Sequence, residues 1–202
     1  ADVKVDLYIE STHVCSEQGE LQLTNYGISG IPVFQLSRVA ARALSEQKKV
    51  YATLNFVPLW EKEQCLTYFK ERFKKADEKR IGEALIGFFP EKLIPVLLEE
   101  SHIKAAKYAN RLQTEELERF IDTVQGLRVD ITDWNTFDTA QVTAGGVDTD
   151  EIDAETMESK LCPGLYFAGE MVDIDGICGG YNLQWAWSSG AVAGIHVARE
   201  LS

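Results

Sequence analysis

The sequence lacks any apolar run long enough to cross a bilayer, and it lacks an excess of basic residues. A membrane-spanning helix needs about 20 consecutive apolar residues, and the N-terminus also lacks the basic start and apolar core of a signal peptide. With 32 acidic against 20 basic residues, the formal net charge is -12. Because such a charge repels phosphate backbones and anionic membranes, we expect a cytoplasmic protein that binds neither nucleic acid nor membrane.

Cysteine is scarce and scattered. The four cysteines, Cys15, Cys65, Cys162 and Cys178, form no CxxC pair and have no histidine at metal-binding spacing. This pattern predicts reduced thiols and no metal site. Cys178 precedes a predicted helix, where a thiol can become reactive, but without a partner cysteine an inert thiol is the favoured interpretation.

The sequence does contain enough apolar residues to build a hydrophobic core. The 202 residues are 45% hydrophobic and 26% charged, which suits a folded chain of one or two domains. Alternating apolar positions predict strands at residues 3–9, 14–16, 20–26, 49–58 and 127–131. Gln18-Gly19 is expected to form the turn between the second and third of these strands, which together suggest an antiparallel β unit.

A helix is expected after Gly27–Gly30, which we interpret as a turn, with Pro32 in its first turn. Apolar residues with helical spacing predict four further helices between residues 61 and 126, with Pro90 ending the second and Thr114 capping the fourth. Residues 61–126 are therefore expected to form a helical insertion in the β unit.

The most informative stretch runs from Gly164 to Gly190. Gly164-Leu-Tyr-Phe-Ala-Gly-Glu170 has the apolar run of a short strand buried on both faces, and a glycine-rich loop then leads to a helix that starts near Tyr181. Glycines at the end of a strand let a backbone approach a ligand, and the free N–H groups of a helix start accept negative charge. The sequence therefore predicts a ligand cradle here.

The helix itself carries a stripe of small residues. This stripe is expected to pack closely on a sheet, and its members are Ala186, Gly190, Ala191, Gly194 and Ala198.

The stretch from Gly164 to Gly190 resembles the C-terminal flavin-binding segment of a bacterial flavoprotein family that includes aminoacetone oxidase and BaiN-type proteins. Gly19-Glu-Leu-Gln-Leu-Thr-Asn-Tyr-Gly-Ile-Ser-Gly30 and Gln141-Val-Thr-Ala-Gly-Gly-Val147 agree with the same family. The resemblance implies FAD as the cofactor of the intact protein, with NAD(P)H as a candidate electron donor. The GxGxxG turn with which the family holds the dinucleotide is absent from the 202 residues, so we expect a C-terminal fragment that binds no FAD by itself.

The resemblance also implies roles for individual residues. Glu170 would accept hydrogen bonds from the ribityl chain of the flavin, and backbone N–H groups at the helix start would face its pyrimidine ring. The implied cofactor-binding residues are Gly145, Gly146, Gly169, Glu170, Gly179, Gly180, Tyr181 and Asn182. From the residues alone, Glu170 could equally be a solvated or helix-capping carboxylate, and the glycines could form an ordinary turn before a core helix.

The predicted fold class is α+β, or mixed: an antiparallel β unit with a helical insertion, then the C-terminal strand, loop and helix of a Rossmann-like FAD-binding domain. The expected inserted domain covers residues 1–140, with its β unit at 1–60 and 127–140 and its helical subdomain at 61–126. Residues 141–202 are expected to belong to the FAD-binding domain.

Two functions from different classes follow from these patterns. The first is a fragment of a FAD-dependent oxidoreductase that acts on a small-molecule substrate, the fragment itself being inactive. The alternative is a non-catalytic protein-interaction or structural domain; a weaker alternative is an unrelated Rossmann-like nucleotide binder. An exposed edge at the first strand predicts self-association.

Overall fold

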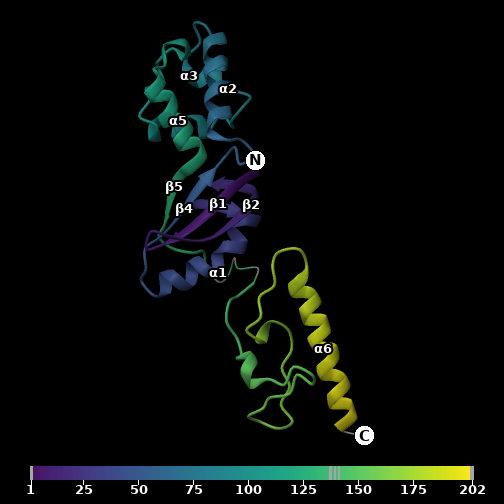
Figure 1. Cartoon of the computed structure of the whole chain (residues 1–202). Coiled ribbons are helices and arrows are strands. Elements are labelled where there is room, and N and C mark those ends of the chain that lie inside the picture. The colour runs from purple at the N-terminus through teal and green to yellow at the C-terminus, as the bar shows by residue number, and fades with distance from the viewer. Residues whose placement is uncertain (1, 137, 139, 141, 201–202) are drawn as a thin grey trace. The chain divides into compact units, whose positions relative to one another are not determined.

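The computed structural model describes residues 2–136, 138, 140 and 142–200. The chain divides into two compact units, Ala1–Thr132 and Asp133–Ser202 (Figure 1). The expected domain boundary, between residues 140 and 141, falls beside Gln141, which lies outside the described residues. Assignment of the units to an inserted domain and an FAD-binding domain stays a prediction.

The first unit is built on a five-stranded sheet in which every neighbouring pair is antiparallel. Its order is β3-β2-β1-β4-β5. The strands are β1 (Asp2–Ile9), β2 (Thr12–Thr24), β3 (Gly27–Gly30), β4 (Val50–Asn55) and β5 (Leu127–Ile131). The unit thus has the α+β class expected from the sequence. Because β1 pairs on both sides, the expected exposed edge at the first strand is wrong, and the sheet instead ends in β3 and β5.

Strand β2 changes partner along its length, which the sequence pattern did not indicate. The predicted turn at Gln18-Gly19 is wrong, because both residues pair with β1 and the chain turns earlier, at Glu10 and Ser11. Likewise Gly27–Gly30 is not a turn but strand β3, paired with the last part of β2. A Cβ on Gly30 would collide with the carbonyl oxygen of Glu20, so glycine permits this close pairing.

Helix α1 (Ile31–Ser45) covers one face of the sheet. Pro32 stands in its first turn, as expected, and its apolar stripe buries Leu36, Ala40 and Ala43. The facing side chains of the central strands are buried as well, and these are Val3, Val5, Leu7, Ala52 and Leu54. The apolar residues at every second position of the strands and those at the 3.6-residue period of the helix therefore pack into one core.

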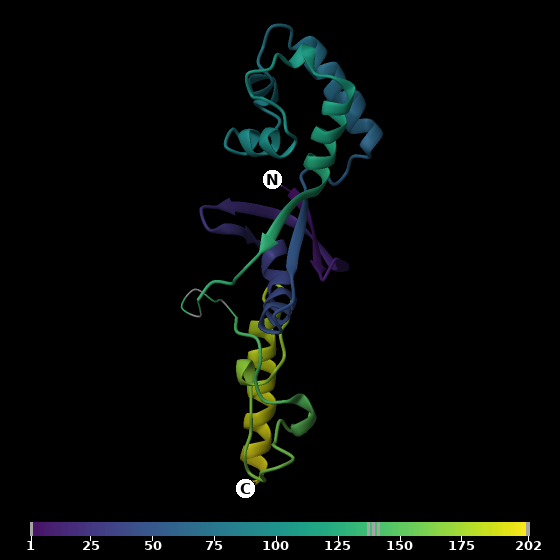
Figure 2. The ribbon, with the colours of Figure 1, turned by 90° about the vertical axis from the view of Figure 1, so that its left-hand side faces the viewer.

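The helical subdomain between β4 and β5 consists of α2 (Lys62–Lys75), α3 (Ile81–Leu85), α4 (Leu93–Glu100), the short η1 (Ala109–Arg111) and α5 (Thr114–Gly126). Phe69 and Phe120 are fully buried at its centre, with their ring centroids 5.5 Å apart. Helix α5 continues directly into β5 (Figure 2). One apolar cluster runs from the sheet into these helices, so the first unit has a single core.

Two helix limits differ from the sequence expectation. Helix α3 ends at Leu85 rather than at Pro90, because Ile86 adopts an extended conformation and Gly87 a positive φ of 82°. The cap of α5 is Gln113 rather than Thr114, since Gln113 and Glu116 form a reciprocal capping box.

The elements with described bounds in the second unit are the short 3-10 helices η3 (Thr149–Glu151) and η4 (Gly169–Met171) and the long helix α6 (Tyr181–Glu200). Its small core is formed by Ile152, Met157, Val172 and Ala193. The expected strand over Leu165–Ala168 is wrong: among the described residues this segment makes only one isolated bridge, from Tyr166 to Glu158, and Leu165 is exposed. A strand needs a ladder of backbone hydrogen bonds to a neighbouring strand, and the described part of this unit offers only single bridges.

None of the described helices combines the length and the apolarity needed to span a membrane.

Candidate functional site

The glycine-rich loop before α6 is braced by the first turn of that helix. Asn182 accepts a hydrogen bond from the backbone N–H of Gly176 at 2.7 Å and donates one to its carbonyl oxygen at 3.1 Å. A Cβ on Gly176 would lie 2.8 Å from the Cβ of Tyr181, so the loop and helix approach too closely for a larger residue. The Asn182 side chain therefore shapes the loop from within.

The start of α6 presents exposed backbone. Gly179 and Gly180 have φ values of 123° and 92°, a region that favours glycine, and both are exposed, as is the Tyr181 ring. The N–H groups of a helix's first turn have no partner within the helix and carry partial positive charge. Helix α6 therefore begins at the predicted limit with exposed backbone, and the anion-accepting role expected of this start stays a prediction.

Gly169 is buried and its backbone is fully engaged by α6. Its N–H donates to the hydroxyl of Ser189 at 2.9 Å, and its carbonyl accepts from the indole N–H of Trp185 at 3.0 Å. The positive φ of 67° provides the sharp turn expected there. Gly169 thus joins η4 to the helix, and neither of its backbone groups is left for a ligand.

Glu170 lies in η4 and is exposed. Its Oε1 accepts hydrogen bonds from the backbone N–H of Thr143 at 2.7 Å and from the Thr143 hydroxyl at 2.9 Å. These two donors, the backbone one foremost, lower the pKa of Glu170 below its ordinary value. Among the described residues nothing donates to Oε2, so the ionised carboxylate keeps an open acceptor.

Gly145 and Gly146 lie along the segment that follows Glu170. The N–H of Val147 donates to the carbonyl of Met171 at 2.8 Å, and the N–H of Asp173 donates to the carbonyl of Val147 at 3.0 Å. A Cβ on Gly146 would stand 2.7 Å from backbone atoms of Met171 and Asp173. The structure therefore brings two of the three stretches that carry the flavoprotein resemblance side by side.

The packed face of α6 is not the predicted one. Ser189 and Ala193 are buried, whereas Gly190 and Gly194 are exposed and a Cβ on either would meet nothing within 4 Å. Of the small-residue stripe, Ala186 contacts the rest of the unit at Gly169. The expectation of close packing along this stripe is wrong within the unit, because Trp185 and Val192 on the other face fill the small core.

Sequence reasoning missed two residues that hold the site together. Thr143 orients Glu170 across 27 residues, and Ser189 reaches Gly169 across 20. For Ser189 a signal existed in the sequence. This residue lies on the same helix face as the apolar residues Trp185 and Ala193, and a serine on an apolar face needs a hydrogen-bond partner. For Thr143 there was none.

Comparison with known proteins places these features in a family. Residues 12–196 match the family described as HI0933-like protein Rossmann domain. The chain is 45% identical over 193 residues, 96% of its length, to a 3-dehydro-bile acid delta(4,6)-reductase of Clostridium scindens. It is 30% identical over 198 residues, 97% of its length, to a ribosomal RNA dihydrouridine synthase of Haemophilus influenzae, and 33% identical over 169 residues, 84% of its length, to the enzyme of that name from Escherichia coli.

These matches cover 47%, 47% and 40% of the three relatives, so the chain spans about half the length of the curated relatives it matches. The family match extends over most of the chain and includes both the β2 stretch and the glycine loop. The chain belongs to the HI0933-like protein Rossmann domain family.

Proposed function

We propose that this chain is the C-terminal part of a FAD-dependent oxidoreductase and that its second unit contacts the flavin. The observation that carries the proposal is that the second unit contains both a glycine-led helix start at Gly179–Asn182 and a carboxylate at Glu170 that Thr143 holds in place. The oxidoreductase relative at 45% identity supports it.

The residues of the second unit fit a flavin in two respects. Glu170 is held by Thr143 and ionised, so its second oxygen can accept hydrogen bonds from the hydroxyls of a ribityl chain. Because Gly179 and Gly180 have no side chains, nothing at these two positions shields the backbone N–H groups at the start of α6. These groups can stabilise negative charge on a ring system. When bound, a flavin supplies the two-electron chemistry of an oxidoreductase.

The proposed reaction is reduction of a carbon–carbon double bond in a small-molecule substrate. A delta(4,6)-reductase reduces double bonds and a dihydrouridine synthase forms a reduced uridine, so the names of the relatives describe one reaction type on different substrates. The higher identity to the bile acid enzyme favours a small molecule over RNA. NAD(P)H is the proposed electron donor, and the proposed location is the cytoplasm.

The 202 residues by themselves are proposed to be inactive. They contain no GxGxxG sequence, and that turn supplies the pyrophosphate site on which most dinucleotide binding depends. Self-association of the isolated chain, if it occurs, is proposed to involve the edge strands β3 or β5.

The test compares the complete gene product with the 202-residue chain. We expect the complete protein to purify with the visible absorbance of bound flavin, and the chain alone to remain colourless after FAD is added and removed by dialysis. In the complete protein Glu170→Gln should weaken FAD binding, while Glu155→Gln, at an exposed position in the same unit, should leave it unchanged.

A complete protein that binds no flavin would overturn the cofactor assignment and favour the non-catalytic alternative. Stoichiometric FAD binding by the 202 residues would overturn only the claim that they are inactive alone.

A further inference from the structure

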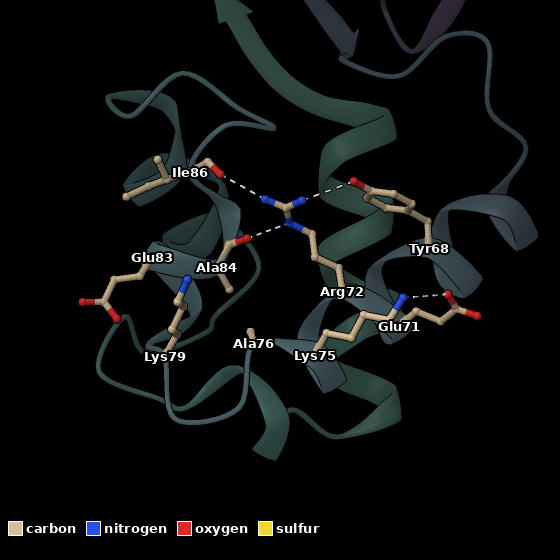
Figure 3. Close-up of a pocket in the computed structure, with 9 residues that line it drawn as sticks. All are labelled: Tyr68, Glu71, Arg72, Lys75, Ala76, Lys79, Glu83, Ala84 and Ile86. Atoms are coloured by element: carbon tan, nitrogen blue, oxygen red, sulfur yellow. Dashed lines mark hydrogen bonds and ion pairs between the residues drawn. The ribbon is translucent and has the colours of Figure 1, made fainter.

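Two hollows lie on either side of Tyr68 in the helical subdomain. The first, of about 360 Å³, lies between α2 and the segment around α3, and Figure 3 shows Arg72 at its centre. The second, also about 360 Å³, is lined by Leu59, Trp60, Gln64 and Tyr68 itself. Each volume lies in the range of small-molecule sites. The first hollow is named the Tyr68 groove, and the residues on which the argument rests are Tyr68, Arg72, Lys75, Lys79 and Ile86.

One half of the Tyr68 groove is aromatic and apolar. The Trp60 and Tyr68 rings meet edge to face with centroids 5.0 Å apart, and Phe88 packs behind both, at 5.7 Å from Trp60 and 5.3 Å from Tyr68. Ile86, which also lines the groove, is 54% exposed. When a flat apolar body covers apolar side chains this open to water, the free energy of the system falls.

The other half is cationic, with Arg72 as its fixed centre. Arg72 donates to the carbonyls of Ala84 at 2.7 Å and Ile86 at 3.0 Å, and to the hydroxyl of Tyr68 at 3.2 Å. All three acceptors are neutral, and in the described part of the chain no carboxylate pairs with Arg72. Its position is therefore rigid while its positive charge is not neutralised by an ion pair.

The lysines add mobile positive charge beside Arg72. Lys75 makes only a long pair with Glu71, at 3.9 Å between two exposed side chains, and such pairs hold their partners weakly. Lys79 is exposed, and no ion pair of its side chain occurs among the described residues. Glu83 is engaged by the backbone N–H of Arg80. Both lysines can therefore turn toward an anion without breaking a strong contact.

We propose that the Tyr68 groove binds an amphipathic carboxylate, that is, a small molecule with a flat apolar body and a single anionic group. The apolar body lies against Tyr68 and Ile86, and the carboxylate faces Arg72, Lys75 and Lys79. The balance of charged side chains in the first hollow favours a ligand with a single anionic group. Because three basic and two acidic side chains line the first hollow, one positive charge is in excess, and the phosphates of an RNA strand would meet Glu71 and Glu83.

The Tyr68 groove lies in the first unit, whereas the residues proposed to contact flavin lie in the second. The site therefore goes beyond the proposed function, and its test needs neither flavin nor activity.

The test is an NMR titration of the 202-residue chain with 2-naphthylacetate, which carries a flat bicyclic body and one carboxylate. We expect chemical-shift changes at the Trp60 indole and at the amides near Tyr68 and Arg72. The neutral alcohol 2-(2-naphthyl)ethanol should bind several-fold more weakly, because it cannot use the positive charge.

Two exposed variants test the two halves of the groove separately. Lys79→Gln should raise the Kd for 2-naphthylacetate about twofold to fivefold, the effect of one exposed charge pair. Ile86→Ser should raise it about threefold to tenfold through lost apolar contact. Lys104→Gln, at an exposed lysine outside the groove, is the matched control and should leave the Kd unchanged.

Equal affinity for the acid and the alcohol would overturn the proposal, and so would shift changes confined to other parts of the chain. A uridine-rich single-stranded oligonucleotide that displaces 2-naphthylacetate from these residues at lower concentration would overturn it in favour of RNA.

Discussion

Gly146 is the residue with the least room for change in the second unit. Its φ is 154°, and a Cβ there would stand 2.7 Å from backbone atoms of Met171 and Asp173, which cannot move aside as a side chain would. We expect Gly146→Ala to destabilise the second unit by about 1–3 kcal/mol, the usual range for strained backbone positions. Urea unfolding followed by hydrogen exchange in peptides of this unit measures the change.

Gly190→Ala is the matched control, because Gly190 is helical, exposed and open around its Cβ position. This variant should stabilise α6 by roughly 0.5–1 kcal/mol. Equal stability of the two variants would contradict the close approach seen at Gly146.

The second residue-scale prediction concerns the pH dependence of Glu170. Its pKa is lowered in the folded chain by the two hydrogen bonds from Thr143, so the contribution of these bonds to stability is fully present above the ordinary carboxyl pKa. It is lost as pH falls through the folded value, which lies below 4.5. Carbon-13 NMR of the Glu170 carboxyl, recorded from pH 6 downward, measures this value.

Thr143→Val removes the hydroxyl donor and keeps the backbone donor. It should move the pKa of Glu170 only part of the way back toward the ordinary value, since the backbone N–H of residue 143 is the larger cause of the shift. A Glu170 carboxyl that titrates at its ordinary value in the unaltered chain would show that the two bonds do not form.

At the scale of elements, α6 and η4 are joined through Ser189. Its hydroxyl accepts from the buried N–H of Gly169 at 2.9 Å and donates to the carbonyl of Trp185 at 2.7 Å. Ser189→Ala leaves the Gly169 N–H without an acceptor, which typically costs about 1–3 kcal/mol. Faster hydrogen exchange over Gly169–Met171 is the expected result.

Ser188→Ala provides the control one position earlier, where the exposed hydroxyl accepts only from the Gln184 side chain. This variant should change stability by less than about 0.5 kcal/mol. If Ser188→Ala were as damaging as Ser189→Ala, the hydrogen bond to Gly169 could not be the cause.

The helices were largely predictable because their signals are local. Pro32 marks the first turn of α1, Tyr181 begins α6 as expected, and Phe69 and Phe120 lie on stripes of helical period that become the core. Each of these features is decided by residues within a few positions in sequence.

The strand partners were not predictable from local patterns. Gly19 has the composition of a turn, yet it pairs with Val3 inside β2, because β2 exchanges β1 for β3 farther along instead of reversing direction. Leu165–Ala168 has the composition of a buried strand, but within the described residues it finds no neighbouring strands. Strand formation depends on partners distant in sequence, and composition does not identify them.

The sequence singled out the glycines and Glu170 as candidate site residues, and their role in binding a cofactor stays a prediction. It gave no indication of the side chains that orient them. The glycine positions follow from the sequence because positive φ and close approach require them. The contacts of Thr143 and Ser189 depend on folded geometry across 27 and 20 residues, so no spacing rule finds them.

At the scale of the whole molecule, the two units have separate cores of very different size. The first unit has one extensive apolar cluster that joins the sheet, α1 and the helical subdomain. Among its described residues, the second buries the apolar side chains of Ile152, Met157, Val172 and Ala193. Since burial of apolar surface is the main source of folding free energy, we expect the second unit to unfold at a lower urea concentration than the first.

Phe120→Ala tests whether the cores are independent. Phe120 is fully buried among Phe69, Phe73 and Phe89, so its truncation should destabilise the first unit by about 3–5 kcal/mol. Hydrogen exchange measured peptide by peptide through a urea series should show the transition of residues 2–132 moving to lower urea, while that of the second unit stays in place. Val96→Ala, at a half-exposed position of α4, should move neither transition appreciably. If Phe120→Ala shifted the peptides of both units by the same amount, the chain would unfold as one cooperative body and the separate clusters would not be separate sources of stability.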